Sequence, residues 1–212
     1  MSPWSDAVVD DVDRPDQRIV LVRHAQTAWS LTGQHTGTTD LPLTDRGRAL
    51  TERLRRRLAG ERFARVMTSP LRRAAETCRI AGFAAEAELR DDLVEWDYGA
   101  HEGRTTAEIR TDDPGWDLWL DGAPGGESPA DVARRMERVV ADLLETCEHG
   151  GDALVFGHGH GLTALAIRWI GLPIEAGRHL RLGTGSVSVL GWKREVRVLE
   201  VWNDRSHLGG AT

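Results

Sequence analysis

Runs of consecutive apolar residues predict the buried strands of a parallel β-sheet. Residues 19–22 (Ile-Val-Leu-Val) and 153–156 (Ala-Leu-Val-Phe) are apolar at every position, which is typical of strands that are covered on both faces. A shorter run at residues 65–68 predicts another strand of this kind. Two closing strands are predicted near the end of the chain, at residues 186–192 and 197–201, with a turn at 193–194 between them.

Between these strands, apolar residues recur at the spacing of amphipathic helices. Leu50, Leu54 and Leu58 predict a helix that is capped by Thr44 and ends near Gly60. A second helix is predicted to start after residue 68, with Ser69 as its cap and Pro70 as its first residue. A third is predicted from Ser128 to about Glu148, and a fourth over residues 162–170. One face of the third helix is apolar (Val132, Met136, Val139, Val140 and Leu143).

The alternation of strands and helices predicts an α/β fold. We expect a three-layer α/β/α sandwich with a mostly parallel central sheet, formed by one domain over residues 18–212. The acidic residues 1–17 are predicted to be a flexible N-terminal tail.

Two long segments do not follow the alternation. Residues 24–43 are polar and predict a long loop, and ordered loops of this length are usually functional. Residues 87–127 are irregular and contain Trp96, Trp116 and Trp119. We expect this segment to be an insertion that caps the functional site rather than part of the sheet, with Trp116 and Trp119 in the core.

Composition narrows the class of protein. The chain has 212 residues, a net charge of -6 and 40% hydrophobic residues, as expected for one globular domain. No apolar run reaches the ~20 residues of a membrane span, and the first residues lack the pattern of a signal peptide. Arginines are interspersed with acidic residues, which argues against nucleic acid as a partner. Cys78 and Cys147 are isolated, so no disulfide framework is expected. These features predict a cytoplasmic protein.

Candidate chemistry lies where the two apolar strands end. Arg23 and His24 follow the first strand, and Gly157 and His158 end the second. In open α/β sheets ligands bind at the carboxyl ends of the strands, so these side chains meet at one edge if the strands are neighbours. Arg72 and Arg73 are expected in the first turn of a helix, where cations need an anion, either a structural carboxylate or a ligand phosphate. Such a cationic pocket suits a phosphoryl group.

Four motifs extend this pattern along the chain. They are LVRHAQTAWSLTGQHTGTTDLPLT at 21–44, SPLRRAAET at 69–77, LVEWDYG at 93–99 followed by Glu102-Gly103, and VFGHG at 155–159. In this order they resemble the motifs of the histidine phosphatase superfamily, the phosphoglycerate-mutase-like clan. Their details most resemble a broad-specificity branch that includes acid phosphatases and a fungal sedoheptulose-bisphosphatase.

The resemblance implies a phosphomonoester hydrolase that works through a phosphohistidine. His24 would attack phosphorus, Arg23, Arg73 and His158 would hold the phosphoryl oxygens, and Glu95 would protonate the leaving oxygen. His24 must then be neutral, with its other ring nitrogen donating to a backbone carbonyl just after it. Glu95 must hold a proton near neutral pH, which calls for a raised pKa in a partly buried site. Glu102 is the rival for the acid. No metal or other cofactor is implied.

Several substrate contacts follow from the same resemblance. Thr36 and Gly37 match loop residues that contact the phosphate or substrate, and the Gly159 backbone N–H can approach an anion. Tyr98 and His160 are further candidates, and Ser30 stands where many relatives have asparagine. The implied substrate is a small phosphorylated metabolite such as a sugar phosphate, and a homodimer is left open.

Three alternatives are open from the sequence. The His158-Gly159-His160 pair indicates a metal site if His24, His35, Asp40 or His101 supply further ligands. A non-catalytic pseudophosphatase that binds a phospholigand is expected to lack catalytic residues, and all are present.

The third alternative is a cofactor-dependent phosphoglycerate mutase, which needs cations that hold a carboxylate. Thr106 and four aspartates stand in the segment where those cations are expected, unless Arg104 or Arg110 turns inward. The sequence therefore favours a phosphatase that prefers phosphosugars over phosphoglycerates. The four aspartates are Asp112, Asp113, Asp117 and Asp121.

Overall fold

The computed structural model describes residues 17–209. The flexible tail predicted for residues 1–17 lies, apart from Gln17, outside the described residues. Within them the chain forms a six-stranded sheet with the strand order β3-β2-β4-β1-β5-β6. The strands are β1 (Ile19–Arg23), β2 (Arg65–Thr68), β3 (Ala87–Leu89), β4 (Ala153–Gly157), β5 (Val187–Lys193) and β6 (Val196–Asp204).

The sheet is mostly parallel, as predicted. β3, β2, β4 and β1 run in the same direction, whereas β5 is antiparallel to β1 and β6 is antiparallel to β5. β1 and β4 are direct neighbours, and their register pairs Arg23 with Gly157. The two polar strand ends that the sequence singled out therefore lie side by side.

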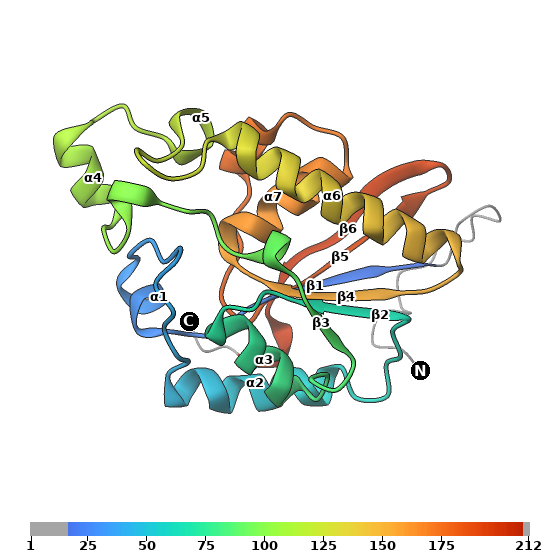
Figure 1. Cartoon of the computed structure of the whole chain (residues 1–212). Coiled ribbons are helices and arrows are strands. Elements are labelled where there is room, and N and C mark those ends of the chain that lie inside the picture. Colours follow the sequence, from blue (N-terminus) through green and yellow to red (C-terminus); the bar gives the residue numbers. More distant parts are fainter. Residues whose placement is uncertain (1–16, 210–212) are drawn as a thin grey trace.

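Helices cover both faces of the sheet, which confirms the three-layer sandwich (Figure 1). α6 and α7 lie on one face, and α2 and α3 lie on the other. The short helices α1, α4 and α5 lie beyond one end of the sheet. The α-helices are α1 (Ala28–Thr32), α2 (Asp45–Arg57), α3 (Arg72–Ala81), α4 (Thr106–Asp112), α5 (Leu118–Asp121), α6 (Pro129–Glu148) and α7 (Gly159–Trp169). Short 3₁₀ segments are η2 (Asp91–Leu93), η3 (Gly99–His101), η4 (Ile174–His179) and η5 (Ser206–Leu208).

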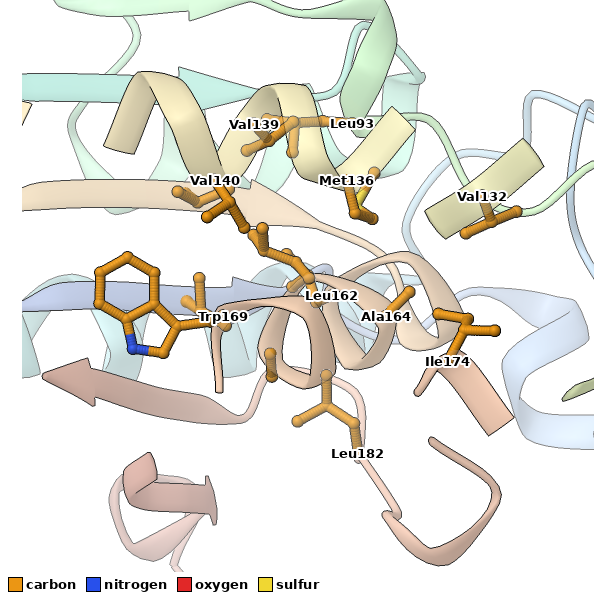
Figure 2. Close-up of a cluster of buried hydrophobic side chains, with 14 of the residues drawn as sticks. Leu93, Val132, Met136, Val139, Val140, Leu162, Ala164, Trp169, Ile174 and Leu182 are labelled. Atoms are coloured by element: carbon orange, nitrogen blue, oxygen red, sulfur yellow. The ribbon is translucent and has the colours of Figure 1, made fainter. Parts of the chain in front are cut away.

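The apolar strands divide their side chains between two core layers. In β1, Ile19 and Leu21 pack under α6 and α7, while Val20 and Val22 pack over α2 and α3. This is the alternation that a strand with two covered faces requires. Figure 2 shows part of the larger layer, including Val132, Met136, Val139 and Val140 of α6 beside Leu162, Ala164 and Trp169 of α7. No helix among residues 17–209 is long and apolar enough to cross a membrane.

Two predicted helix caps are confirmed, and two predicted helix starts are wrong. Thr44 caps α2, and Ser128 caps α6 in a capping box with Asp131. α3 begins at Arg72 rather than Pro70, because the Ser69 hydroxyl is turned to the Leu71 N–H instead of capping a helix. The cap comes from another loop: Asp40 accepts the Arg72 N–H at 2.7 Å. α7 begins at Gly159, three residues before the predicted start.

The two irregular segments contain more regular structure than predicted. Residues 24–43 include the short helix α1, and the 87–127 insertion includes β3, α4 and α5. The expectation that this insertion holds no sheet is therefore wrong, since β3 pairs in parallel with β2. β3 has only three residues, Ala-Glu-Leu, which carry no strand pattern. β6 also extends beyond the predicted 197–201.

The 87–127 insertion contacts the 24–43 segment, and its tryptophans are part of the core. Trp96, Trp116 and Trp119 are buried, which confirms the core assignment of the last two. Gln34 forms an isolated antiparallel bridge with Thr105, and Gln34 also donates to the Gly103 carbonyl at 2.8 Å. The insertion therefore caps the same end of the sheet that α1 flanks.

Arg135 of α6 holds the first part of the insertion in place through hydrogen bonds and an ion pair. Its guanidinium forms a two-point ion pair with Glu127 at 3.0 and 2.8 Å. It also donates to the carbonyls of Asp92 and Val94, at 2.7 and 2.8 Å. One side chain therefore satisfies backbone groups on both sides of Leu93, just before Glu95.

Replacement of Arg135 by alanine should be strongly destabilising. Its side chain is only 9% exposed, and removal of one partner of a buried ion pair leaves uncompensated polar groups that cost about 3–5 kcal/mol. The neighbouring Arg134 is 64% exposed, so Arg134→Ala should cost less than about 1 kcal/mol. Urea unfolding of both variants measures the contrast. Equal small losses would show that Arg135 does not hold the insertion.

Candidate active site

A cavity of about 440 Å³ lies at the carboxyl ends of β1 and β4. It is lined by Arg23 and His24 from β1 and the residue after it, by Glu95 and Tyr98 from the insertion, and by the start of α7. Another cavity, of about 370 Å³, lies between α2 and η5 and contains none of the predicted site residues. The first cavity is therefore the candidate active site.

His24 is fixed as a neutral imidazole. Its Nδ1 lies 2.7 Å from the Ala25 carbonyl oxygen, which only accepts, so the proton is on Nδ1 and the Nε2 lone pair is available. Burial and the nearby guanidiniums of Arg23 and Arg73 hold the pKa of His24 well below 6.5. Both requirements set for a nucleophile, a neutral ring and a backbone carbonyl as its partner, are met.

Arg23 lines the cavity and has a buried donor that no described residue uses. Its Nη1 donates to the Leu182 carbonyl, but its buried Nε has no hydrogen-bond partner among the described residues. The guanidinium lies over Gly159, where an added Cβ would be 3.1 Å from its central carbon. A larger residue at position 159 would therefore displace the arginine. An unpaired buried donor of this kind is suited to an anion.

Arg73 and His158 form a buried chain behind His24. Arg73 Nε donates to His158 Nδ1 at 3.1 Å, so His158 carries its own proton on Nε2, 2.7 Å from the Ser69 hydroxyl. Three more N–H groups of Arg73 donate to carbonyls of residues 36, 37 and 39. Four of its five N–H groups are thus taken, and one on Nη1 is left by the described residues.

This arrangement bears on the predicted phosphate contacts. His158 is fully buried, and both of its ring nitrogens are bonded to protein groups. The rings of His24 and His158 are 5.2 Å apart between centroids. His158 can bind a phosphoryl oxygen only by giving up Ser69, whereas Arg73 has one donor to offer. The roles predicted for both residues stay predictions.

Glu95, from the insertion, caps the N-terminus of helix α7. Its carboxylate accepts the backbone N–H groups of His160 and Gly161, at 3.1 and 2.8 Å, and that of Trp96 at 2.9 Å. Burial by itself raises the pKa of this carboxyl, but the three backbone N–H groups outweigh it and lower the pKa below 4.5. The expectation of a raised pKa is therefore wrong for the unliganded protein, because hydrogen bonds to the charged form dominate.

Glu102, the rival acid, has a structural position instead. Its carboxylate accepts the N–H groups of Gly37 and Thr39, at 2.9 and 3.0 Å, and it does not line the cavity. Gly37 is packed tightly, since an added Cβ would be 2.5 Å from the Trp96 carbonyl oxygen. The Gly37 N–H is bonded to Glu102, and the Gly37 carbonyl accepts a hydrogen bond from Arg73. Gly37 therefore fixes the conformation of the loop and does not line the cavity.

Aromatic and imidazole side chains form another part of the cavity wall. The Tyr98 hydroxyl lies 2.6 Å from His160 Nδ1. Burial, together with Glu95, raises the pKa of Tyr98 well above 10, so Tyr98 is the donor. Burial lowers the pKa of His160 and lowers that of His35 to about 4, so both rings are neutral. Tyr98, His160, His35 and Trp119 line the cavity.

Ser30 and Thr36 line the cavity but are partly committed. The Ser30 hydroxyl closes the capping box of α1 with Thr27, donating to its carbonyl at 2.9 Å. Ser30 can therefore accept a hydrogen bond from substrate but has no free proton to give. The Thr36 hydroxyl donates to the Gln34 carbonyl at 3.2 Å. Their substrate contacts, like those of Gly159 and His160, stay predictions.

Comparison with known proteins agrees with this geometry. The family model of the histidine phosphatase superfamily (branch 1) matches residues 19–205. The chain belongs to the histidine phosphatase superfamily.

Several relatives are similar over most of their length. An acid phosphatase of Mycobacterium tuberculosis is 40% identical over 91% of this chain and 95% of its own. A sedoheptulose 1,7-bisphosphatase of Saccharomyces cerevisiae is 33% identical over 74% and 69%. A probable phosphoglycerate mutase of Proteus mirabilis is 32% identical over 90% and 94%. A solved M. tuberculosis structure matches with a TM-score of 0.85 at 38% identity, over 89% and 97%. The predicted family and fold class are confirmed.

The charged residues that line the cavity of this histidine phosphatase differ from those expected. None of the four aspartates at positions 112, 113, 117 and 121 lines the cavity. Arg104 is paired with Asp112, and Arg110 donates to the Trp116 carbonyl, so neither turns inward. Instead Arg178 and Arg181 line the cavity, from η4 and the segment that follows it. No sequence signal marked them, because a 3₁₀ helix and a loop carry no apolar period.

The described residues contain no group of three or more His, Cys, Asp or Glu side chains that could hold a metal ion. The His-x-His pair is directed to other partners: His158 bonds to Ser69 and Arg73, and His160 bonds to Tyr98. Metal independence stays a prediction, since its test is an activity measurement.

The pKa of Glu95 predicts how its contribution to stability depends on pH. A carboxyl whose folded-state pKa is lowered stabilises the protein above the unfolded-state value and loses that contribution as pH falls through the folded-state value. The stability difference between wild type and Glu95→Gln should therefore be largest near neutral pH and should shrink below about pH 4.5. Urea unfolding across pH measures it, with exposed Glu86→Gln as the control. A difference that grows on acidification would contradict the capping role.

Proposed function

We propose that this histidine phosphatase hydrolyses phosphomonoesters through a phosphohistidine on His24, without a metal ion or other cofactor. The observation that carries the proposal is the state of His24. Its proton is held on Nδ1 by the Ala25 carbonyl, and it lines the cavity beside an arginine with unpaired donors. A neutral imidazole in a cationic pocket is a nucleophile suited to a phosphoryl group.

In the first step the Nε2 lone pair of His24 attacks phosphorus, and the bond from phosphorus to the ester oxygen breaks. Glu95 gives its proton to that oxygen. The carboxyl is ionised in the unliganded protein, so it must take up a proton when the substrate binds. A phosphate dianion beside it raises its pKa and thereby promotes this uptake.

In the second step water attacks the phosphohistidine. Glu95, now a carboxylate, accepts the proton of the water, the bond from phosphorus to nitrogen breaks, and His24 returns to its starting state. Arg23 and the one free N–H of Arg73 stabilise the charge on the phosphoryl oxygens. The backbone N–H of Gly159, at the positive end of α7, is a further donor at this edge.

The pseudophosphatase alternative gains no support from the site. His24, Arg23, Arg73 and Glu95 are all present and lie at one strand edge, in or directly behind the same cavity. A cytoplasmic location and a homodimer stay proposals from the sequence.

A phosphoglycerate mutase is a second candidate, because a specific observation favours it. Arg178 and Arg181 line the cavity and can supply the cations that the insertion lacks. The two reactions differ in the second acceptor, which is water in a phosphatase and a substrate hydroxyl in a mutase. With 3-phosphoglycerate and bisphosphoglycerate, free phosphate without isomer supports the phosphatase, and isomer formation that outpaces phosphate release supports the mutase.

His24→Ala should abolish turnover, by on the order of a thousandfold or more, while the fold survives. Wild-type protein quenched during turnover of labelled nitrophenyl phosphate should carry an acid-labile, hydroxylamine-sensitive label, and the variant should carry none. A metal chelator is present throughout, so activity lost on chelation and restored by zinc or manganese would overturn metal independence. Exposed His149→Ala is the matched control. Substantial turnover by His24→Ala would exclude it as the nucleophile.

Glu95→Gln should slow the hydrolysis of esters with poor leaving groups far more than that of nitrophenyl phosphate. General acid catalysis is worth roughly a hundred- to ten-thousandfold, but a nitrophenolate leaves without a proton. The measurement is kcat of wild type and of Glu95→Gln on glycerol 3-phosphate and on nitrophenyl phosphate, and the loss on the first substrate is compared with the loss on the second. Glu102→Gln, which disturbs the 36–39 loop, should lower both rates equally. Equal losses in Glu95→Gln would assign it a positioning role only.

A further inference from the structure

Two arginines outside the catalytic set line the candidate active-site cavity. Arg178 lies near the end of η4, and Arg181 lies three residues further along. The reaction proposed above makes no use of either. The remaining charged side chains on the cavity wall are Arg23 and Glu95.

The segment that carries the two arginines is held in place at several points. Gly177 lies against Trp119, where an added Cβ would be 2.4 Å from the indole. Arg178 pairs with Asp117 at 2.9 Å. The Arg181 carbonyl accepts Trp202 Nε1 at 2.9 Å, and the next carbonyl, that of Leu182, accepts Arg23 Nη1. The segment is therefore tied directly to the arginine that faces the scissile phosphate.

The described residues neutralise only part of the charge of this segment. Arg178 has Asp117 as its partner, but no carboxylate within residues 17–209 lies within ion-pair distance of Arg181. Glu95, the acidic group on the cavity wall, is committed to the N-terminus of α7. His35 and His160 are neutral because their pKa values are lowered. Positive charge therefore remains beside the cavity, apart from that of Arg23 and Arg73.

We propose that Arg178 and Arg181 form a second anion subsite, so that the preferred substrates carry a second anionic group besides the scissile phosphate. That group is a carboxylate or another phosphate, since both suit a guanidinium fork. The proposal rests on the proposed phosphomonoesterase function. It replaces the expectation that the cavity favours a neutral polyol, which relied on aspartates that do not reach it.

Substrate pairs that differ in one distal group test the subsite. Glycerol 3-phosphate and 3-phosphoglycerate differ by a hydroxymethyl group against a carboxylate. Fructose 6-phosphate and fructose 1,6-bisphosphate differ by a hydroxyl against a phosphate. Nitrophenyl phosphate, with a single anionic group, is the reference. kcat/KM is measured for wild type, for the double variant Arg178→Ala/Arg181→Ala, for Arg181→Lys and for the exposed control Arg79→Ala.

Wild type should prefer the doubly anionic member of at least one pair by about tenfold, which is the effect of a well-placed charge-assisted contact. The double variant should lose this preference and keep its rate on nitrophenyl phosphate within about twofold. Arg181→Lys should keep part of the preference, and Arg79→Ala should leave it unchanged. Added salt should weaken the preference. The pair that responds tells carboxylate from phosphate.

A ratio near one for both pairs in wild type, or a preference that survives in the double variant, would overturn the subsite. Calorimetric binding of 3-phosphoglycerate and glycerol 3-phosphate to His24→Ala gives the same comparison without turnover. A binding preference that depends on the two arginines, in a wild-type protein that releases no phosphate from any substrate, would support the subsite and reject the hydrolase. Phosphate release with no preference in rate or binding would support the hydrolase and reject the subsite.

Discussion

The parallel pairing of β1 with β4 is the constraint on which the site depends. Its register places Arg23 opposite Gly157, so the residues that follow, His24 and His158, meet at one edge of the sheet. Both strands are buried on both faces, which makes the pairing rigid. A shift of one residue would turn the side chains of β1 to the opposite core layer, and the packing of both layers opposes it.

Buried charge is compensated here by the backbone more than by opposite charges. Arg73 is fully buried and donates to three carbonyls and one histidine, while Glu95 accepts three N–H groups. This arrangement holds both groups in their charged states with little freedom to move. The acid role proposed for Glu95 then requires that an arriving phosphate dianion raise the pKa of this carboxyl.

The cavity has two electrostatic zones. The inner zone contains the neutral imidazole of His24 and the guanidinium of Arg23. The outer zone contains neutral aromatic rings and the arginines of the segment 178–181. Apart from Glu95, the acidic residues of the insertion do not line the cavity; Asp112 and Asp117 pair with arginines, and Asp121 accepts the Asp117 N–H. The insertion therefore contributes Glu95, shape and aromatic surface to the site, and the segment after α7 contributes two further positive charges.

The sequence alone determined the central strands, the layer order and the motif residues, because apolar runs and helical periods are local signals. It also predicted the neutral state of His24, since a carbonyl just after it is a local partner. Only the tertiary structure decided the state of Glu95, because its three N–H partners include two from α7, 65 and 66 residues further along the chain. The same holds for the start of α3, capped by Asp40, and for Arg178 and Arg181. Their position depends on packing against Trp119 and Trp202, and long-range contacts of this kind leave no periodic trace in a sequence.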